Sequence, residues 1–578
     1  MSLPLFAPGH DRGVDPVTGL PDAVALADFL AAPPSDSAGT AEGRPPGSDF
    51  LLLLELYPQA RDAKRGLAAI QRSGAYLHSL FGASTPLYSL GLGLFALVWS
   101  GVAPAEARRM TDTLLRRLRR EEFVRAHIGL ARLRHNGKNE VGVVDKAWQA
   151  LAVARKRGPF GLCVAGSERI FPPPGPAERA RLSRLWRGRD RFALLDIHQD
   201  QPAVSNYFVK RVRSALAPDT PALFLNQREI MVYLDGADEA AARAWLGDFR
   251  DRMRESGGVT FSVGIALYPC PGFRKSQLPV NSRKARLHAE LLGPDSVAVF
   301  NGITLNVSGD AYYNEGDIRK AVAEYRQGLS LDPANVNLLN SLGVALVQLK
   351  QPRSALACFE KVLAAEPDNF MAWCNLGFVH LSADRDQAAI ACFERALAVN
   401  GGPFDLLLQL GKLYCRHRRY TEAAELLQLC VGDPQIEERQ EGDLAAALRL
   451  LSQALAALDQ KRPAMEAAQK ALHLNPRDPE ALSLLGELYL LNGEGEDIAL
   501  SLCRQAVELD GERGDYWRRL GWVQWRRGEI VAAEESLARA LSLCRRDSLA
   551  ARWLAEIYRQ QGRQRQAERI SARANRMR

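Results

Sequence analysis

The sequence predicts a multidomain protein in which two α/β domains precede an all-α solenoid. Strands alternate with helices in the same order twice before residue 301. A proline-rich stretch, FPPPGP at 171–176, separates the two copies and cannot lie inside a helix. From about residue 302 the pattern becomes purely helical, with a period of 34 residues. We therefore expect domains at 1–168, 177–301 and 302–578.

The composition is that of an ordinary globular protein with several domains. Hydrophobic residues make up 47% of the 578 residues and charged residues 25%, so a core is easily built. The net charge of +8 is modest for this length and does not indicate nucleic-acid binding. The nine cysteines include no C-x-x-C pair, which argues against zinc and against disulfides. We expect no metal and no cofactor, and we expect Cys358, Cys392 and Cys503 to be small buried hydrophobes.

Neither a signal peptide nor a membrane span is expected. The N-terminus has no basic region followed by an apolar core. The uncharged stretch 83–105 is long enough to test as a span, but it is interrupted by prolines and glycines. Its apolar pieces have the length of strands, and a buried hairpin explains them better than a membrane helix. We expect a cytoplasmic protein.

The two α/β copies follow one plan. In each, a strand and a helix precede a β-hairpin, and a helix, a strand and a last helix follow it. The expected elements of the first copy are a strand at 50–57, the hairpin at 87–99, a helix at 105–120, a strand at 124–133 and a helix at 146–157. Those of the second are strands at 192–197, 222–226, 229–234, 259–269 and 296–300, with helices ending at 215 and spanning 237–255 and 283–292.

The helical region repeats small and bulky residues at fixed places. Glycines recur at 309, 343, 377 and 411, and alanines at 321, 355, 389 and 423. Tyr325, Phe359, Phe393 and Leu427 keep the same step. Small residues let the two helices of a unit approach, and the bulky residue fills the space beside them. The pattern continues less regularly to the C-terminus, after an insertion at 435–441, and predicts about eight helix–turn–helix units.

Residues from 302 to the end resemble tetratricopeptide repeats, as in LNSLGVALVQLKQPRSALACFEKVLAAEPDN. The resemblance implies a solenoid whose first helices line a groove for a peptide or a partner helix. Early in the array this face would present amides suited to a peptide backbone, from Asn306, Asn340 and Asn375. Late in the array it would present Arg518, Arg519, Trp522, Trp525, Arg526 and Arg552.

Two interpretations of the late residues stay open. In DYWRRLGWVQWRRGE, Arg518, Trp522 and Trp525 share one helical face, and arginine and tryptophan dominate binding hot spots. Alternatively, the tryptophans pack against the neighbouring repeat while the arginines are solvated. Stacking on single-stranded nucleic acid is a weaker reading, because no nucleic-acid motif accompanies these residues.

The first 300 residues resemble two degenerate copies of the GGDEF domain of diguanylate cyclases. DPVTGLPD at 15–22 is similar to the entry motif of that family, and VTFSVGIALYP at 259–269 to its late strand. ALAVARKRG at 150–158 and ARLHAELLG at 285–293 resemble its final helix. The resemblance implies an antiparallel-containing sheet with helices, and an ancestral activity that condenses two GTP molecules with a divalent metal.

Such a metal needs carboxylates, and the sequence supplies too few. By the resemblance, Glu55 and Asp196 stand at the end of the first strand of each copy. The hairpin tip reads Gly91-Leu92-Gly93-Leu94-Phe95 in the first copy and Asn226-Gln227-Arg228-Glu229-Ile230 in the second. Arg228 stands where a metal ligand is expected and would repel the ion. Because the hairpins supply too few carboxylates, we expect no catalytic residues. The R-x-x-D inhibitory motif of the family is also absent.

For the remaining acids, an ordinary surface position is favoured over a role in binding or catalysis. We expect Glu55 and Asp196 to be solvated strand ends and Glu229 to be an exposed acid of the hairpin. Leu92 and Leu94 suggest that the first hairpin packs against something apolar, which is consistent with the two copies facing each other.

The leading hypothesis is a non-catalytic scaffold of a bacterial signalling type. Its repeat groove would bind a partner protein, and the pseudo-cyclase domains would form a regulatory or dimerising platform, with a homodimer as one form. An alternative is a sensor of GTP or cyclic di-GMP that uses Asp196, Arg228 and Glu229. A third possibility is residual cyclase or hydrolase activity completed by a partner chain.

Overall fold

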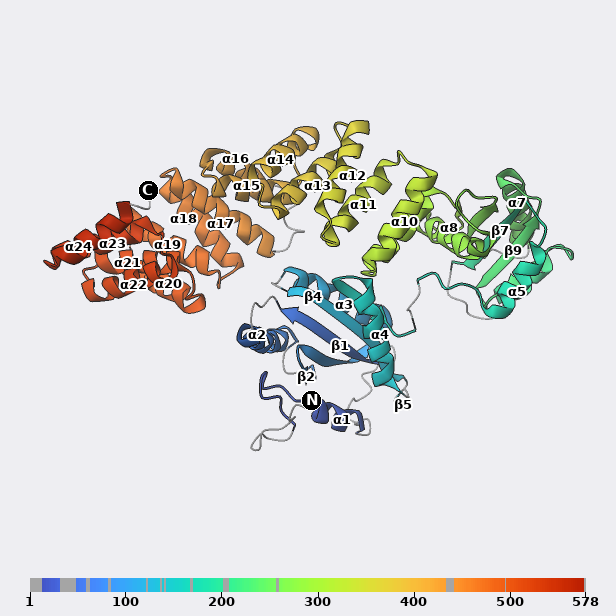
Figure 1. The fold of residues 1–578 in the computed structure, drawn as a ribbon, viewed down its shortest axis with the longest axis horizontal. Coiled ribbons are helices and arrows are strands. Elements are labelled where there is room, and N and C mark those ends of the chain that lie inside the picture. Colours follow the sequence, from blue (N-terminus) through green and yellow to red (C-terminus); the bar gives the residue numbers. More distant parts are fainter. Residues whose placement is uncertain are drawn as a thin grey trace. The chain divides into compact units, whose positions relative to one another are not determined.

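The structure is a computed structural model, drawn in Figure 1. It describes residues 13–31, 48–58, 63–81, 85–120, 123–135, 138–139, 142–166, 170–200, 207–255, 259–432, 441–493 and 495–575. Most of the proline-rich insertion at 31–49, the predicted domain end at 168 and most of the insertion at 435–441 lie outside the described residues. The chain divides into two compact units, Met1–Pro367 and Asp368–Arg578, and each is described by itself.

The first α/β domain is a sheet covered by helices. Its strands are β1 (Ser48–Pro58), β2 (Leu87–Gly91), β3 (Leu94–Val102), β4 (Phe123–His135), β5 (Lys138–Asn139) and β6 (Phe160–Val164). They are ordered β2-β3-β1-β4, and β4 pairs with both β5 and β6. The helices are α1 (Ala23–Ala31), α2 (Ala63–Phe81), α3 (Pro104–Arg120) and α4 (Val143–Arg157).

The central strand explains why its sequence is apolar without alternation. Leu51 to Leu54 of β1 are fully buried, with Leu52 and Leu54 in one hydrophobic cluster and Leu51 and Leu53 in another. Both faces of the sheet are therefore covered. The DPVTGLPD segment contacts the hairpin, because Asp15 Oδ2 accepts a hydrogen bond of 2.7 Å from Ser89 Oγ of β2.

The second α/β domain has the same strand order. Its elements are α5 (Pro176–Leu185), β7 (Phe192–Gln199), α6 (Tyr207–Ala215), β8 (Ala222–Phe224), β9 (Glu229–Asp235), α7 (Glu239–Glu255), β10 (Phe261–Tyr268), α8 (Leu278–Leu292) and β11 (Val297–Val299). The order β8-β9-β7-β10-β11 matches β2-β3-β1-β4-β6 of the first domain, and both sheets end in one parallel pair.

The two copies correspond residue by residue from the hairpin onwards. Helices α3 and α7 begin at 104 and 239, and α4 and α8 begin at 143 and 278, which is a shift of 135 residues for both pairs. The same shift relates Gly129 of β4 to Gly264 of β10. A Cβ at Gly129 would lie 2.3 Å from the Ala147 carbonyl oxygen, and one at Gly264 would lie 2.0 Å from that of Ser282. Only glycine lets the following helix pack this closely on the strand.

Four helices of the first unit form two helical hairpins. They are α9 (Gly302–Asn314), α10 (Ile318–Leu331), α11 (Val336–Gln348) and α12 (Pro352–Ala365). Both α/β domains contact the first of these hairpins. Lys284 of α8 forms a hydrogen bond of 2.8 Å with Glu324 of α10, and Arg157 at the end of α4 lies 3.3 Å from Glu315 after α9.

The second unit holds twelve further helices among its described residues. They are α13 (Phe370–Ser382), α14 (Asp386–Asn400), α15 (Phe404–Arg416), α16 (Tyr420–Val431), α17 (Glu441–Ala457), α18 (Lys461–Leu474), α19 (Pro479–Asn492), α20 (Glu496–Leu509), α21 (Gly514–Arg526), α22 (Ile530–Leu543), α23 (Ser548–Gln560) and α24 (Gln564–Asn575). Successive hairpins pack against each other, and the first helices α15, α17, α19, α21 and α23 also contact one another in turn (Figure 1).

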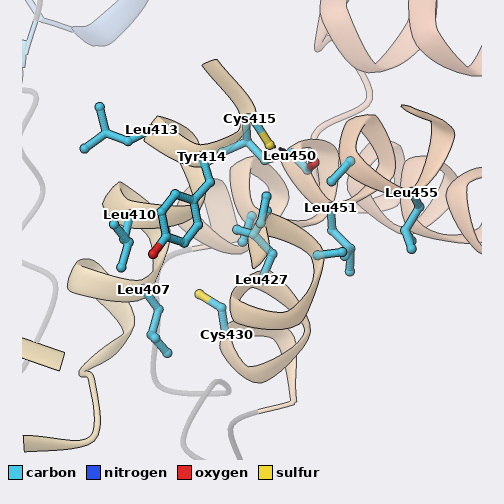
Figure 2. Close-up of a cluster of buried hydrophobic side chains, with 14 of the residues drawn as sticks. Leu407, Leu410, Leu413, Tyr414, Cys415, Leu427, Cys430, Leu450, Leu451 and Leu455 are labelled. Carbon is cyan, nitrogen blue, oxygen red and sulfur yellow. Dashed lines mark hydrogen bonds between the residues drawn. The ribbon is translucent and has the colours of Figure 1, made fainter. Parts of the chain in front are cut away.

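The repeated small and bulky residues meet as the sequence predicts. A Cβ at Gly377 would lie 2.4 Å from the Phe393 ring, and one at Gly411 would lie 2.8 Å from Leu427. Figure 2 shows Leu427 beside Leu410, Tyr414 and Cys430 in the core of this unit. Where the glycine is lost, Ser452 takes its place and donates a hydrogen bond of 2.8 Å to the Ala464 carbonyl oxygen.

The turns of the helical hairpins share one backbone feature. The turn inside each hairpin has a residue in the left-handed region: Gly316, Lys350, Asp384, Arg418, Asp459, Gly493, Gly528 and Gly562. Cys358, Cys392 and Cys503 are buried free thiols, which confirms the prediction made for them. Burial raises the pKa of the Cys503 thiol to about 12, so it stays protonated and packs as a hydrophobe.

Candidate functional site

The Asp196 carboxylate is buried, which corrects the prediction of a solvated strand end. Asp196 lies at the centre of β7 and is fully inaccessible. Its Oδ2 accepts a hydrogen bond of 2.8 Å from Nε of Arg286, which comes from α8. Burial raises the pKa of Asp196 to about 6; the positive charge of Arg286 opposes this rise and the nearby Glu229 adds to it. The carboxylate is thus held by a guanidinium that the protein itself supplies.

Glu229 at the start of β9 is also buried and paired, so the prediction of an exposed hairpin acid was wrong. Its side chain is 12% exposed, and its Oε1 lies 2.6 Å from Nε of Arg283 on α8. Its Oε2 accepts a hydrogen bond of 3.0 Å from Asn226 Nδ2. Arg283 also donates to the carbonyl oxygen of Pro172 in the linker. These contacts leave little of the carboxylate for a ligand.

Arg228 does not point at either acid. Its Nη2 donates a hydrogen bond of 2.7 Å to the carbonyl oxygen of Gln199 at the end of β7. The cations that neutralise the acids are therefore Arg283 and Arg286, not the arginine of the hairpin. The sequence held a signal for them, since RKAR at 283–286 places two arginines one helical turn apart.

The register of the first domain corrects a second prediction. Asp196 pairs with Gly264, and the residue that pairs with the corresponding Gly129 is Leu53, not Glu55. Glu55 lies two residues further along β1, where the second domain has His198. The acid position of the first domain is thus a fully buried leucine.

Glu55 is partly shielded and bound by its own domain. Arg155 of α4 donates two hydrogen bonds of 2.8 Å to its two carboxylate oxygens. His127 Nδ1 lies 3.5 Å from Glu55 Oε2. Burial acts to raise the pKa of Glu55, but the hydrogen bond and charge of Arg155 prevail and lower it. The predicted solvated strand end is instead an ion-paired one.

The tip of the first hairpin is open to solvent. Leu92 has a φ of 52° and is 94% exposed, while Leu94 is half-buried against the sheet. Gly93 is required at the turn, because a Cβ there would lie 2.7 Å from the Leu56 carbonyl oxygen. The expected apolar packing of Leu92 is therefore absent, and no described residue covers this side chain.

Two of the predicted groove residues are engaged in contacts between repeats. Arg519 of α21 is 8% exposed, and its Nε lies 2.8 Å from Glu487 of α19. Arg518 lies 3.1 Å from Asp547, which caps the N-terminus of α23. Both arginines therefore join successive first helices of the second unit.

The tryptophans pack while the flanking arginines stay open. Trp522 stacks on Trp553 of α23, with ring centroids 5.5 Å apart and an interplanar angle of 15°. Trp525 Nε1 donates a hydrogen bond of 3.1 Å to Gln560. Arg526 and Arg552 are exposed, and neither forms an ion pair with a described residue. The packing interpretation is therefore confirmed for the two tryptophans and for the solvated Arg526 and Arg552, but not for Arg518 and Arg519, which are ion-paired. Binding of a partner at these residues stays a prediction.

The three early asparagines are half-buried. Asn306 donates to Asp310 of its own helix at 3.2 Å. Asn306 and Asn340 stand three residues before the repeat glycine, whereas Asn375 stands two before it and so lies on a different line of its helix. Asn375 belongs to the second unit and the other two to the first.

The described part of the chain contains no group of three or more His, Cys, Asp and Glu side chains that could hold a metal ion. Nor does any described helix combine the length and apolarity needed to cross a bilayer.

Comparison with known families agrees with the helical hairpins. A family described as TPR repeat matches residues 309–350, and a family described as tetratricopeptide repeat matches 342–402, 387–435 and 497–548. The helical region of this chain contains tetratricopeptide repeats. Their glycine, alanine and bulky positions are those whose contacts are described above.

Curated relatives share the repeats over short stretches. Protein O-mannosyl-transferase TMTC1 of Homo sapiens is 26% identical over 172 residues, which is 24% of this chain and 19% of that protein. The Mus musculus protein of the same name is 33% identical over 101 residues, 16% of this chain and 10% of its own length. The chain thus spans at most a fifth of the relatives it matches.

Solved structures with similar repeats cover less than half of this chain. The APC/C heterotetramer Cut9–Hcn1 is 16% identical, with a TM-score of 0.34, over 47% of this chain and 52% of that chain. PilF of Pseudomonas aeruginosa is 18% identical, with a TM-score of 0.32, over 39% of this chain and 98% of that one. YrrB, described as a TPR protein with an unusual peptide-binding site, is 23% identical, with a TM-score of 0.27, over 33% and 95%. All three TM-scores lie below 0.5.

Proposed function

We propose that this chain is a non-catalytic, cytoplasmic scaffold of a signalling type. Its tetratricopeptide repeats bind a segment of a partner protein, and its two α/β domains are degenerate GGDEF-like domains that serve as a regulatory or dimerising platform. The free cysteines support a reducing compartment. The motifs at 15–22 and 259–269 and the shared strand order support the GGDEF-like assignment.

One observation carries the non-catalytic part of the proposal. Both acids of the second domain are bound by arginines of α8, Asp196 by Arg286 at 2.8 Å and Glu229 by Arg283 at 2.6 Å. A divalent ion would have to displace both guanidinium groups before it could use these carboxylates. The first domain has Leu53 at the corresponding position. The nucleotide-sensor and residual-cyclase alternatives both require these salt bridges to open.

Incubation of the full chain with GTP and Mg²⁺ or Mn²⁺ tests this part. We expect no cyclic di-GMP, and none from Arg286→Leu either, because the first domain still lacks its acid. Product formed by the wild type and abolished by Asp196→Asn would overturn the proposal. Calorimetry with GTP, GDP and cyclic di-GMP tests the sensor alternative. Binding that is lost in both Asp196→Asn and Glu229→Gln would favour a sensor over a scaffold.

The proposed client surface lies on the first helices of the last two repeats. Trp522 and Trp553 form a stacked pair, and the exposed Arg526 and Arg552 belong to the same two helices, α21 and α23. An aromatic platform with unpaired cations suits an acidic segment that carries an aromatic or apolar residue. Arg519 is not included, because Glu480 and Glu487 already hold it.

Quantitative affinity capture with the full chain tests the surface. Trp522→Ala combined with Arg552→Ala should lose a client that the wild type retains. Arg546→Ala, which removes an exposed arginine in the loop before α23, is the matched control and should retain it. Arg518 is avoided, because its loss would also disturb the contact with Asp547. A client set unchanged by the double substitution would overturn this assignment.

A further inference from the structure

A basic cleft lies where the first α/β domain meets the first two repeats. Its volume is about 210 Å³, and all of its lining residues belong to the first unit. The start of β4, the end of α4 with the turn that follows, the first turn of α10 and the end of α11 with the turn after it form its walls. Its basic side chains are Arg125, His127, Arg155, Lys156, Arg319 and Lys350.

The described residues around the cleft carry more positive charge than they neutralise. Among them, no aspartate or glutamate lines the cleft. Arg155 is bound by Glu55, as described above. The other four cations, Arg125, Lys156, Arg319 and Lys350, are exposed and form no ion pair with a described residue. Like charges that converge on one small cleft repel each other, and an anion in that cleft would relieve the repulsion.

A buried polar side chain lines the same cleft. His127 is 4% exposed, and its Nε2 lies 3.0 Å from the carbonyl oxygen of Gly158. Its Nδ1 has no hydrogen-bond partner among the described residues, although Glu55 lies 3.5 Å away. Burial lowers the pKa of His127, so the imidazole is neutral at pH 7 and adds a polar group without adding charge.

The second domain shows that the fold does not require this charge. A shift of 135 residues takes Arg125, Arg155 and Lys156 to Thr260, Glu290 and Leu291. Glu290 pairs with His198 at 3.0 Å, so the same end of the second domain is internally neutralised. The basic cleft is therefore particular to the first domain and its contact with the repeats.

We propose that this cleft binds the phosphate groups of a small polyphosphate, either free or as the end of a nucleotide. Arginine forks and lysine ammonium groups are the side chains that recognise phosphate oxygens. Cations converge from the α/β domain and from both repeats on one small volume, which suits a compact anion better than an extended acidic peptide. None of the described lining residues is Phe, Tyr or Trp, so a nucleobase would find no large aromatic ring to stack on. This site is separate from the hairpin of the second domain.

An anion in the cleft would connect two parts of the first unit. Lys156 belongs to α4, whereas Arg319 belongs to α10 and Lys350 to the turn after α11. The backbones already approach closely there, since a Cβ at Gly158 would lie 2.9 Å from the Gly316 carbonyl oxygen. A bound polyphosphate would thus strengthen the contact between the α/β domain and the first two repeats.

Calorimetry of the full chain with inorganic triphosphate tests the proposal. We expect binding that weakens as salt is raised, and an affinity lower by about tenfold or more in Lys156→Gln combined with Arg319→Gln. Arg353→Gln is the matched control, because Arg353 is exposed, stands 34 residues after Arg319 and does not line the cleft. It should bind as the wild type does. Equal thermal unfolding of the three proteins shows that the fold is retained.

Further ligands distinguish the sources of phosphate and the rival occupant. GTP and ATP should bind within a few-fold of triphosphate, and amide exchange in residues 156–161 and 348–351 should slow when any of them binds. No heat with millimolar triphosphate, or an equal loss of affinity in Arg353→Gln, would overturn the proposal. A polyglutamate peptide that binds more tightly than triphosphate, and depends on Lys156 and Arg319, would also overturn it in favour of an acidic protein segment.

Discussion

Leu53 and Asp196 occupy the same position in the two α/β domains, each paired with the glycine on which the next helix packs. Leu151 and Arg286 correspond in the same way on α4 and α8. One domain therefore packs leucines in a common apolar cluster, where the other buries a carboxylate against a guanidinium. A buried ion pair is costly to break but seldom superior to apolar packing of similar volume.

Arg286→Leu should destabilise the second α/β domain by about 3–5 kcal/mol, because the Asp196 carboxylate would stay buried without its partner. Asp196→Leu combined with Arg286→Leu recreates the leucines of the first domain and should cost much less. Opening free energies from amide exchange in β7 and β10 measure both effects. The prediction would be contradicted if the double variant lost as much free energy of unfolding as Asp196→Leu and Arg286→Leu lose together when each is made alone.

Asp196 should also make the stability of this domain depend on pH. Its pKa is raised to about 6 in the folded protein, above the 3.8 of an unperturbed aspartate. The folded state therefore holds the proton more strongly, and the contribution is fully present below about pH 3.8 and lost as pH rises through 6. Relative to that of Asp196→Asn, the free energy of unfolding of the wild type should rise by on the order of 1–3 kcal/mol as pH falls from 7 to 4. Amide exchange of β7 in both proteins measures the difference. A constant difference across this range would show that the carboxylate titrates normally.

Substitution of a glycine in the helical region should destabilise the protein only where a bulky side chain faces that glycine. At Gly377 a Cβ would lie 2.4 Å from the buried Phe393 ring, and Gly377→Ala should cost about 1–3 kcal/mol. Gly442 in α17 has open space around it, and Gly442→Ala should be neutral or stabilise by up to about 1 kcal/mol. Thermal unfolding of the full chain gives the two signs, and equal effects would contradict the steric explanation.

The contact between the second domain and the first repeat should depend on Lys284. Its ammonium group lies 2.7 Å from Glu324 Oε2, and the two side chains are 6% and 12% exposed. Lys284→Met should cost about 3–5 kcal/mol and speed exchange in α9 and α10, because Glu324 would keep only Ser308 as a partner. Lys320→Met is the control on α10, the helix of Glu324, since Lys320 is 52% exposed and its pair with Asp317 is worth under about 1 kcal/mol.

Two arginines should stabilise the contact between successive repeats. Each stands three residues before the repeat glycine or the serine that replaces it. Arg518 pairs with Asp547 at 3.1 Å, and Arg449 pairs with Asp478 at 3.3 Å, 69 residues earlier in both cases. Each aspartate caps the first helix of the next repeat. Arg518→Ala should therefore cost about 1–3 kcal/mol and loosen α23, whereas Arg526→Ala should change stability little. Amide exchange in α23 separates the two, and equal protection in both variants would rule out this stabilisation.

The helical region was predictable because its packing is local. A glycine and a bulky residue 16 positions apart meet within one hairpin, so the spacing of Gly377 and Phe393 already implies their contact. The α/β elements were also readable from strand and helix patterns. The residue that corresponds to Asp196 could not be predicted, because the segments between the first strand and the hairpin differ in length. The structure shows that it is Leu53 and not Glu55.

The candidate acids show what the sequence left open. Asp196 lies near the end of a predicted strand and Glu229 in a predicted hairpin, which suggested solvent exposure, yet both are buried. Their partners Arg283 and Arg286 lie more than 50 residues away in the sequence. Only the docking of α8 on β7 and β10 brings them together.

The sequence by itself determined the repeat period, the duplicated α/β pattern and the scarcity of acids at the hairpin tips, because these features lie in spacings and residue types. The tertiary structure decided which charges neutralise one another and which stay uncompensated. The charge of Asp196 is paired with Arg286, whereas Arg319 and Lys156 have no acid partner among the described residues around one cleft. Charge compensation depends on distances across the fold, and a linear pattern does not contain those distances.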